Sequence, residues 1–166
     1  GCGSCGMSGM CVLQDDYENE LKPMIINTDM IVFVMPVYYY NWPAPLKACV
    51  DRFYSFTMEL TAMHKKAAFL SVAWDDTDTV FDIPKAYYKQ VCSYMDFEDC
   101  GMVLGRGCGT PSMTRSSQYP QQAYELIELT NKNDGAETGI LDLHEKEKLL
   151  NINLKEDRKI LHFGQL

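Results

Sequence analysis

Short apolar runs alternate with amphipathic stretches along this chain. The apolar runs are too short for helical cores and predict strands of a parallel sheet, at Ile31–Met35, Ala67–Ala73 and Gly101–Leu104. Apolar positions recur at helical spacing in four other segments, at Tyr17–Asn27, Lys47–Phe56, Ile83–Met95 and Tyr119–Thr130. Pro23 interrupts the first of these and predicts a kink or a later helix start. The alternation of strands and helices predicts an α/β fold.

The stretch Asp29–Arg52 carries the clearest functional signal. A buried strand ends at Pro36, and an aromatic loop then leads into a helix. The loop consists of Val37, Tyr38, Tyr39, Tyr40, Asn41 and Trp42. Open α/β sheets bind ligands at the carboxyl ends of their strands. Aromatic side chains at that place predict a site for a planar aromatic ligand, with the residues from Pro36 to Trp42 as its wall.

Four short motifs occur in an order that is found in one family of proteins. They are Cys11-Val12-Leu13-Gln14-Asp15-Asp16, Pro36-Val37-Tyr38, Pro45-Leu46-Lys47 and Asp51-Arg52. In these motifs the chain resembles the flavodoxin-like flavoproteins, which include NAD(P)H-dependent FMN reductases and iron–sulfur flavoproteins. The resemblance covers Cys2 to Leu129 and is strongest up to Ser55.

The resemblance implies a three-layer flavodoxin-like parallel sheet with helices on both faces, and a noncovalently bound FMN. Electrons would pass from NAD(P)H to a quinone, a free flavin or another acceptor. Because the cofactor performs this chemistry, we expect no catalytic side chain. Ala73, Trp74 and Asp75 follow the second strand and are, by position, candidate contacts to the flavin pyrimidine edge. Members of the family are commonly dimers or tetramers, so we expect a homo-oligomer.

The resemblance also predicts that the domain is incomplete at its N-terminal side. In the family, a strand, a phosphate loop, a helix and a second strand precede the cysteine loop, whereas here the cysteine loop begins at Gly1. We expect the chain to be a fragment, a trimmed form or a divergent member. The flavodoxin-like domain then covers residues 1–130, and residues 131–166 form an appendage. Its apolar positions, among them Ile152 and Ile160, favour an edge hairpin or a dimer arm.

Seven cysteines, an odd number widely scattered, favour a reducing compartment. Cys2, Cys5 and Cys11 are candidate iron–sulfur ligands, because CxxC spacing brings two sulfurs to one metal site. A cluster takes four cysteines, and the family has its further cysteine near Ser8. A distant cysteine or a neighbouring subunit could supply the fourth ligand. Alternatively, the loop packs at a subunit contact or has a thiol–disulfide role.

Composition and charge exclude some partners. The net charge of −8 argues against nucleic acid or an anionic membrane, because phosphate groups attract clustered lysine and arginine. No apolar run approaches the roughly 20 residues of a membrane-spanning helix, and we expect a cytoplasmic protein. The glycine-rich residues 105–109 lack the ending of a Walker motif, which favours an ordinary loop over a phosphate cradle. Arg106 is a candidate for steering a nicotinamide phosphate or for completing the flavin pocket.

Three functional hypotheses follow. The first is an FMN-dependent oxidoreductase that accepts electrons from NAD(P)H. The second is a non-catalytic flavodoxin-like interaction subunit. The third is an electron carrier that holds an iron–sulfur cluster at Cys2, Cys5 and Cys11.

Overall fold

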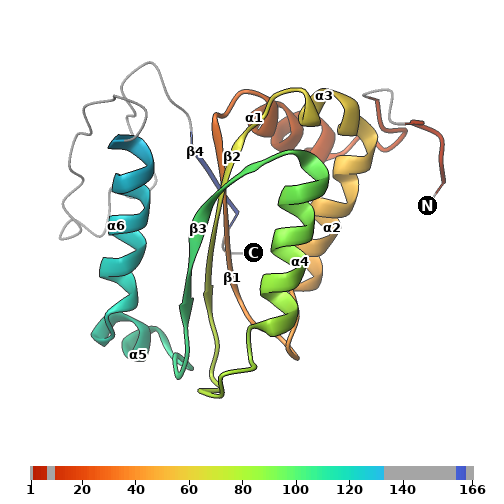
Figure 1. Cartoon of the computed structure of the whole chain (residues 1–166). Helices are drawn as coiled ribbons and strands as arrows, with labels where there is room; N and C mark the ends of the chain where they lie inside the picture. Colours follow the sequence, from red (N-terminus) through yellow and green to blue (C-terminus); the bar gives the residue numbers. More distant parts are fainter. Residues whose placement is uncertain (1, 7–9, 133–159, 164–166) are drawn as a thin grey trace.

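The computed structural model of the protein describes residues 2–6, 10–132 and 160–163 (Figure 1). Its helical elements are η1 (Tyr17–Leu21), α1 (Lys22–Ile26), α2 (Ala44–Asp51), η2 (Arg52–Phe56), α3 (Thr57–Thr61), α4 (Asp82–Met95), α5 (Pro111–Ser116) and α6 (Tyr119–Lys132). Its strands are β1 (Met30–Pro36), β2 (Lys66–Val72), β3 (Glu98–Gly105) and β4 (Ile160–Phe163). The three predicted strands are therefore confirmed, with small shifts at their ends.

In the described part of the chain, the strands form one parallel sheet with the order β3-β2-β1-β4. β1 lies inside the sheet, with Met30 opposite Lys66 of β2 on one side and opposite Ile160 of β4 on the other. Strands in this position are covered on both faces. The first four residues of β1 are accordingly almost fully buried.

Helices cover both faces of the sheet and give three layers (Figure 1). On one face, α2 and α4 contribute to the core around Ile31 and Phe33. On the other face, α6 packs on a second cluster around Met30 and Val32. Successive residues of a strand point to opposite faces, so β1 contributes alternately to the two clusters. The expected α/β fold with helices on both faces is confirmed.

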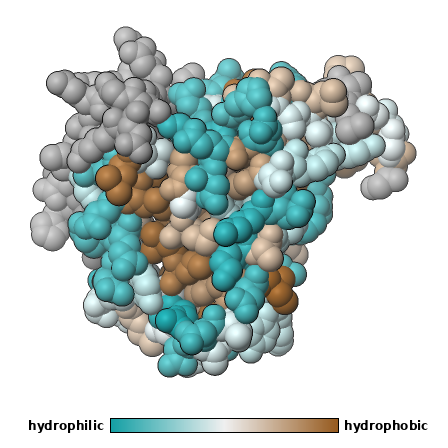
Figure 2. All heavy atoms as spheres, in the orientation of Figure 1, coloured by the Kyte–Doolittle hydropathy of each residue, from teal (hydrophilic) through white to brown (hydrophobic). Residues whose placement is uncertain are grey.

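The edge of the sheet at β3 is apolar and partly open. Figure 2 shows apolar side chains gathered in the middle of the view, over β3 between α6 and α4. Among the residues of this strand, Met102, Val103 and Leu104 are half-buried. Within the described residues β3 has a neighbour on one side only, β2.

An aromatic stack fills the core beneath α4. The rings of Phe69 and Tyr88 are stacked, with centroids 5.2 Å apart and an interplanar angle of 19°. The Tyr88 hydroxyl lies 3.0 Å from the Ala67 carbonyl oxygen and 2.8 Å from a carboxylate oxygen of Asp99, so its proton has two acceptors. Burial of this hydroxyl raises the pKa of Tyr88. A buried tyrosine hydroxyl needs a hydrogen-bond partner, and here the bonds from Tyr88 to Ala67 and Asp99 fix α4 on the sheet.

The helix predicted at Tyr17–Asn27 changes type along its length. It begins as a π-helical turn, η1, and continues as α1. Pro23 falls in the first turn of α1, directly after the π-helical turn, so its missing N–H removes one donor to that turn at the point where the helix changes type. The carboxylate of Asp15 accepts the Glu18 N–H at 3.3 Å and so caps this end of the helix.

The helix predicted at Lys47–Phe56 is also divided. α2 ends at Asp51, and the 3-10 helix η2 follows as far as Phe56. The Ser55 hydroxyl donates to the Arg52 carbonyl oxygen at 3.0 Å. Hydroxyl groups that compete for backbone carbonyls in this way disfavour a continuous α-helix.

The described part of the C-terminal region joins the main sheet. Ile160–Phe163 form β4 and pair in parallel with β1, whereas Ile152, in the other half of the expected hairpin, lies outside the described residues. In the described part of the chain, no helix combines the length and the apolar character needed to cross a membrane.

Candidate functional site

A tight turn with two strained tyrosines follows β1. The Tyr38 N–H donates to the Asn41 carbonyl oxygen at 3.2 Å, and the Asn41 N–H donates back to Tyr38 at 3.1 Å. The two central residues, Tyr39 and Tyr40, have φ of 47° and 60°, as in a type I′ turn. This backbone region costs a non-glycine residue about 1–3 kcal/mol, and such strain is frequent at ligand sites.

The turn presents aromatic surface to solvent. Tyr38, Tyr39 and Tyr40 are 62%, 99% and 52% exposed. The Tyr40 hydroxyl donates to a carboxylate oxygen of Asp75 at 3.4 Å and so connects this turn to the loop after β2. The structure thus brings Tyr40 of the turn and Asp75 of the loop after β2 together. Pro36 and Asn41 are exposed beside them. Val37 is half-buried because it packs against the cluster of Ala73, Val80 and Phe81.

The loop after β2 presents Trp74, whose side chain is 75% exposed. Its ring lies against Gly109, where an added Cβ would come within 1.9 Å of the indole. The Cys108 N–H also donates to the Ala73 carbonyl oxygen at 2.7 Å. The glycine-rich residues after β3 therefore support the loop after β2. This packing explains why position 109 holds a glycine. From the sequence alone, this glycine indicates only a loop.

The hydrogen-bonding groups of the loop after β2 differ in whether they are free to bind a ligand. Ala73 is 4% exposed and its N–H donates to Gly105, so it offers no donor to a ligand. The Asp75 carboxylate accepts the Thr77 N–H at 2.9 Å, and this bond is the largest cause that lowers the pKa of Asp75. Within the described residues, the N–H groups of Trp74 and Asp75 donate no hydrogen bond.

Trp42 does not belong to the exposed wall, which corrects the expectation that it stacks on a ligand. It is 5% exposed, and its ring is stacked on Phe69 at 5.5 Å and meets Tyr87 edge-on at 4.9 Å. Its indole N–H donates to the Pro84 carbonyl oxygen at 3.1 Å. A tryptophan needs both apolar cover and a partner for its N–H, and the core supplies both here.

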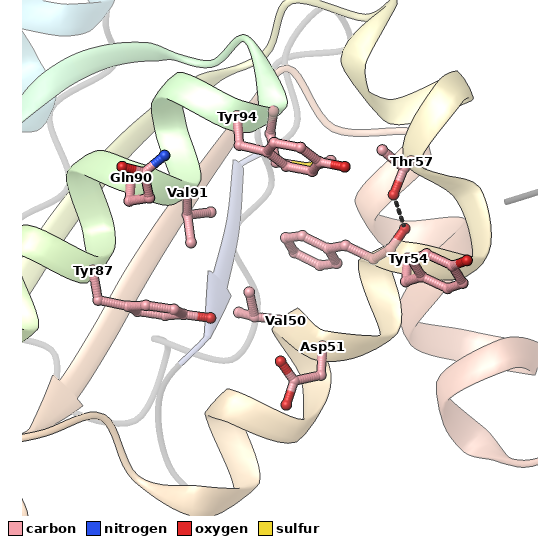
Figure 3. Close-up of a pocket in the computed structure, with 10 residues that line it drawn as sticks. Val50, Asp51, Tyr54, Thr57, Tyr87, Gln90, Val91 and Tyr94 are labelled. Carbon is pink, nitrogen blue, oxygen red and sulfur yellow. Dashed lines mark hydrogen bonds between the residues drawn. The ribbon is translucent and has the colours of Figure 1, made fainter. Parts of the chain in front are cut away.

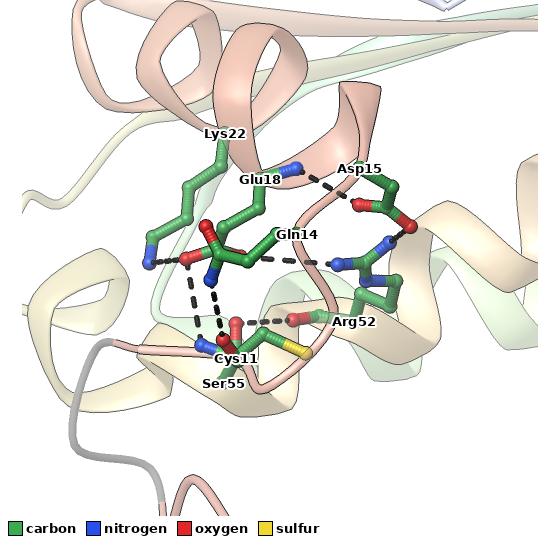
Figure 4. A network of polar contacts seen from close by, with 7 residues as sticks. All are labelled: Cys11, Gln14, Asp15, Glu18, Lys22, Arg52 and Ser55. Atoms are coloured by element: carbon green, nitrogen blue, oxygen red, sulfur yellow. Dashed lines mark hydrogen bonds and ion pairs between the residues drawn. The ribbon is translucent and has the colours of Figure 1, made fainter.

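Arg52 fixes the cysteine loop to the domain (Figure 4). Its guanidinium donates to a carboxylate oxygen of Asp15 at 2.6 Å and lies 3.9 Å from Glu18. Glu18 also pairs with Lys22 at 2.7 Å and accepts the Cys11 N–H at 3.4 Å. The Asp51-Arg52 motif therefore anchors the loop, and Asp51 itself pairs with the Lys47 ammonium group.

The three candidate cluster ligands lie at the N-terminal side of this network. Cys2 is exposed, and Cys5 and Cys11 are half-buried. Hydrogen bonding from Ser4 lowers the pKa of the Cys2 thiol. Within residues 2–6, 10–132 and 160–163, no three histidine, cysteine or acidic side chains are grouped closely enough to hold a metal ion. The cluster remains a prediction from the sequence.

A cavity of about 310 Å³ lies elsewhere, between α4 and the segment that runs from α2 into α3 (Figure 3). Tyr54, Tyr87 and Tyr94 line it together with the buried Phe53 and Met95. None of its lining residues comes from the loops that follow β1, β2 or β3. The cavity is thus separate from the aromatic turn.

Comparison with known proteins gives consistent results. Iron-sulfur flavoprotein from Archaeoglobus fulgidus is 42% identical over 52 residues, which is 31% of this chain and 23% of that protein. Iron-sulfur flavoprotein from Methanosarcina thermophila is 41% identical over 51 residues, 31% of this chain and 26% of that protein. The chain therefore matches about a quarter of the length of these relatives.

A solved structure and a family model extend the comparison over most of the chain. The Trp repressor binding protein from Bacillus subtilis superposes with a TM-score of 0.57 at 21% identity, over 68% of this chain and 76% of that one, and this likeness concerns the fold. The family model described as "Flavodoxin-like fold" matches residues 14–129. The predicted resemblance is confirmed, and the chain belongs to the flavodoxin-like fold family.

Proposed function

We propose that this chain binds FMN noncovalently at the carboxyl ends of β1 and β2 and takes part in electron transfer from NAD(P)H to a quinone, a flavin or another acceptor. The observation that carries the proposal is the strained turn of exposed tyrosines at the end of β1. Three exposed aromatic side chains, two of them on a strained backbone at Tyr39 and Tyr40, need a reason beyond packing.

The groups at this edge fit a flavin. Its ring system needs a flat aromatic surface, which Tyr38, Tyr40 and Trp74 can provide because all three are more than half exposed. Its pyrimidine edge carries carbonyl oxygens that need donors, and the N–H groups of Trp74 and Asp75 have no partner among the described residues. When bound, the flavin would supply the redox chemistry, accepting a hydride from NAD(P)H and passing its electrons to the acceptor.

The residues of this chain then bind and orient the cofactor. The hydrogen bond from Tyr40 to Asp75 ties the two loops together, so the ring faces and the backbone donors keep a fixed relative position. Donors held at the carbonyl edge stabilise negative charge there and favour the reduced cofactor. No side-chain acid or base is required. We further propose a homo-dimer or tetramer as the working form.

The direct test is a flavin titration in which binding is measured by the quenching of flavin fluorescence. We expect the full chain to bind FMN, and Tyr38→Ala and Trp74→Ala each to lose about 1–3 kcal/mol of binding free energy, the usual worth of one aromatic stacking contact. Tyr54→Ala is the matched control, since Tyr54 is 49% exposed but lines the separate cavity. Equal affinity in all four proteins would exclude the stacking site.

A second candidate function is electron carriage by an iron–sulfur cluster. It is supported by the partial likeness to two iron-sulfur flavoproteins and by the anchoring of the loop that carries Cys11. Protein purified without air should then contain iron and acid-labile sulfide, and Cys11→Ser should lose both. If the protein holds neither iron nor flavin, the remaining hypothesis is the non-catalytic interaction subunit.

A further inference from the structure

The helix α4 carries two rows of apolar and aromatic residues. One row, which includes Tyr88 and Cys92, is buried against the sheet. The other row consists of Tyr87, Val91 and Tyr94, whose spacing of four and three residues places them on one side of the helix. Figure 3 shows this second row lining the cavity between α4 and the segment from α2 into α3. Tyr94 is 64% exposed, so the domain itself leaves this row open to solvent.

The opposite wall of the cavity follows from the change of helix type after α2. The α-helix ends at Asp51 and continues as the 3-10 helix η2. Residues three apart lie on the same side of a 3-10 helix, and Tyr54 and Thr57 accordingly both line the cavity. Tyr54 is half exposed, whereas Phe53 and Met95 close the cavity from inside as buried apolar side chains.

The lining residues offer no unpaired charge to a ligand. Asp51 is the one carboxylate among them, and it pairs with the Lys47 ammonium group. The same ammonium group lies 5.4 Å from the centroid of the Tyr87 ring, so it has a carboxylate and an aromatic face as partners. An ionic ligand would have to lose its hydration without gaining a free counter-ion, which is unfavourable. The cavity therefore favours a neutral ligand.

The polar groups of the lining differ in what they can contribute. The Thr57 hydroxyl donates to a backbone carbonyl oxygen at 3.0 Å and is already used within the helix. Gln90 is exposed and lines the cavity, and its side-chain amide can both donate and accept a hydrogen bond. A hydroxyl or carbonyl group on a ligand would suit this amide.

The size and the aromatic lining indicate the shape of the ligand. The cavity has a volume of about 310 Å³, whereas a cavity of about 150 Å³ already accepts benzene. There is thus room for roughly two fused rings, at the lower end of the range for small-molecule sites. Tyrosine rings make favourable stacked or edge-on contacts with aromatic rings, and the Met95 thioether also favours an aromatic neighbour.

We propose that this cavity is a second ligand site, separate from the candidate flavin site, for a neutral planar molecule of about two fused rings that carries a hydroxyl or carbonyl group. The rings lie against the row of Tyr87, Val91 and Tyr94, and the polar group meets Gln90. The inference does not depend on flavin binding, because none of the lining residues belongs to the loops after β1, β2 or β3.

Methyl NMR of the full chain tests the proposal with 2-naphthol as the probe. Met95 lines the cavity, whereas Met30 belongs to the cluster on the other face of the sheet and serves as the internal control. In protein labelled with ¹³C at the methionine methyl groups, Met95→Leu identifies the Met95 signal. We expect this signal to shift and saturate with a midpoint below about 1 mM, and the Met30 signal to stay in place. The absence of a saturable Met95 shift up to that concentration would overturn the proposal.

Two substitutions locate the bound probe. Tyr94→Ala removes one aromatic wall, and Val91→Phe fills part of the cavity with a further ring. We expect each to weaken 2-naphthol binding by about tenfold, the effect of losing roughly one aromatic contact. Tyr39→Ala is the matched control, because it removes an exposed tyrosine from the candidate flavin site and should leave the midpoint unchanged. If both cavity variants bind like the unaltered chain, 2-naphthol does not occupy this cavity and the proposal fails.

A competition experiment separates this inference from the proposed function. We expect saturating FMN to leave the 2-naphthol midpoint at Met95 unchanged, because the two sites share no residue. Displacement of 2-naphthol from the Met95 site by FMN would show one shared site and refute the inference. If the chain does not bind FMN at all, the proposed function fails, while the Met95 titration still decides whether the cavity binds a ligand.

Discussion

Replacement of Trp42 by phenylalanine separates a core residue from a ligand contact. The indole N–H donates to the Pro84 carbonyl oxygen at 3.1 Å, and phenylalanine removes this donor. The carbonyl is then left without that partner in a buried place, at a cost of about 1–3 kcal/mol. The smaller ring also leaves a cavity of roughly 40 Å³, which adds about 1 kcal/mol at about 24 cal/mol per Å³. We expect a total loss of about 2–4 kcal/mol in the free energy of unfolding.

Urea denaturation followed by far-UV circular dichroism measures this loss. Tyr39→Ala is the control, because Tyr39 is 99% exposed and its side chain packs on no core residue. FMN affinity of the Trp42→Phe protein, measured well below its unfolding transition, should equal that of the unaltered chain. A loss of stability below about 0.5 kcal/mol, the usual range for surface substitutions, or a weakened FMN affinity in a fully folded variant, would refute the assignment of Trp42 to the core.

Three further predictions concern charge, burial and backbone contact. The hydrogen bond from Arg52 lowers the pKa of Asp15 below its ordinary value of 3.8, so Asp15 stabilises the fold above that pH and less below it. Asp15→Asn should therefore lower the urea midpoint at about pH 7 and have a smaller effect at about pH 2.5, and equal effects at both would contradict the pairing. Burial raises the pKa of Cys92 to about 11, so iodoacetamide should modify it only in urea, as peptide mass spectrometry would show. Gly109→Ala should displace the Trp74 ring and shift its fluorescence, whereas an unchanged spectrum would exclude the contact.

Much of the fold is predictable because its signals are local. Apolar runs such as Ile31–Met35 identify the strands, since a parallel strand is buried on both faces whatever its neighbours are. The motifs around Pro36-Val37-Tyr38 identify the family and the end of the sheet where we propose the site. The exact helix ends are less predictable, because they depend on single groups in neighbouring turns. Pro23 lacks an N–H donor, and the Ser55 hydroxyl competes for a backbone carbonyl.

The candidate site is only partly predictable from the sequence. The sequence places Tyr38, Tyr40 and Trp42 together in one aromatic loop, and nothing local distinguishes a tryptophan that faces a ligand from one that completes the core. The type I′ turn directs Tyr39 and Tyr40 outward. The indole of Trp42 points inward instead, where the carbonyl oxygen of Pro84 in α4 accepts its N–H. Pro84 is distant from Trp42 in the sequence, so no local pattern predicts this hydrogen bond.

The sequence by itself determined the α/β class, the three consecutive strands, the family and the edge of the sheet at which aromatic residues gather, because these depend on periodicity and on residues close together in the chain. The tertiary structure alone decided three features. Trp42 lies in the core, Gly109 supports Trp74, and Ile160–Phe163 pair with β1. Each of these results from contacts between segments that are far apart in the chain, and such contacts are selected by the burial and hydrogen bonding of the whole fold rather than by local preference.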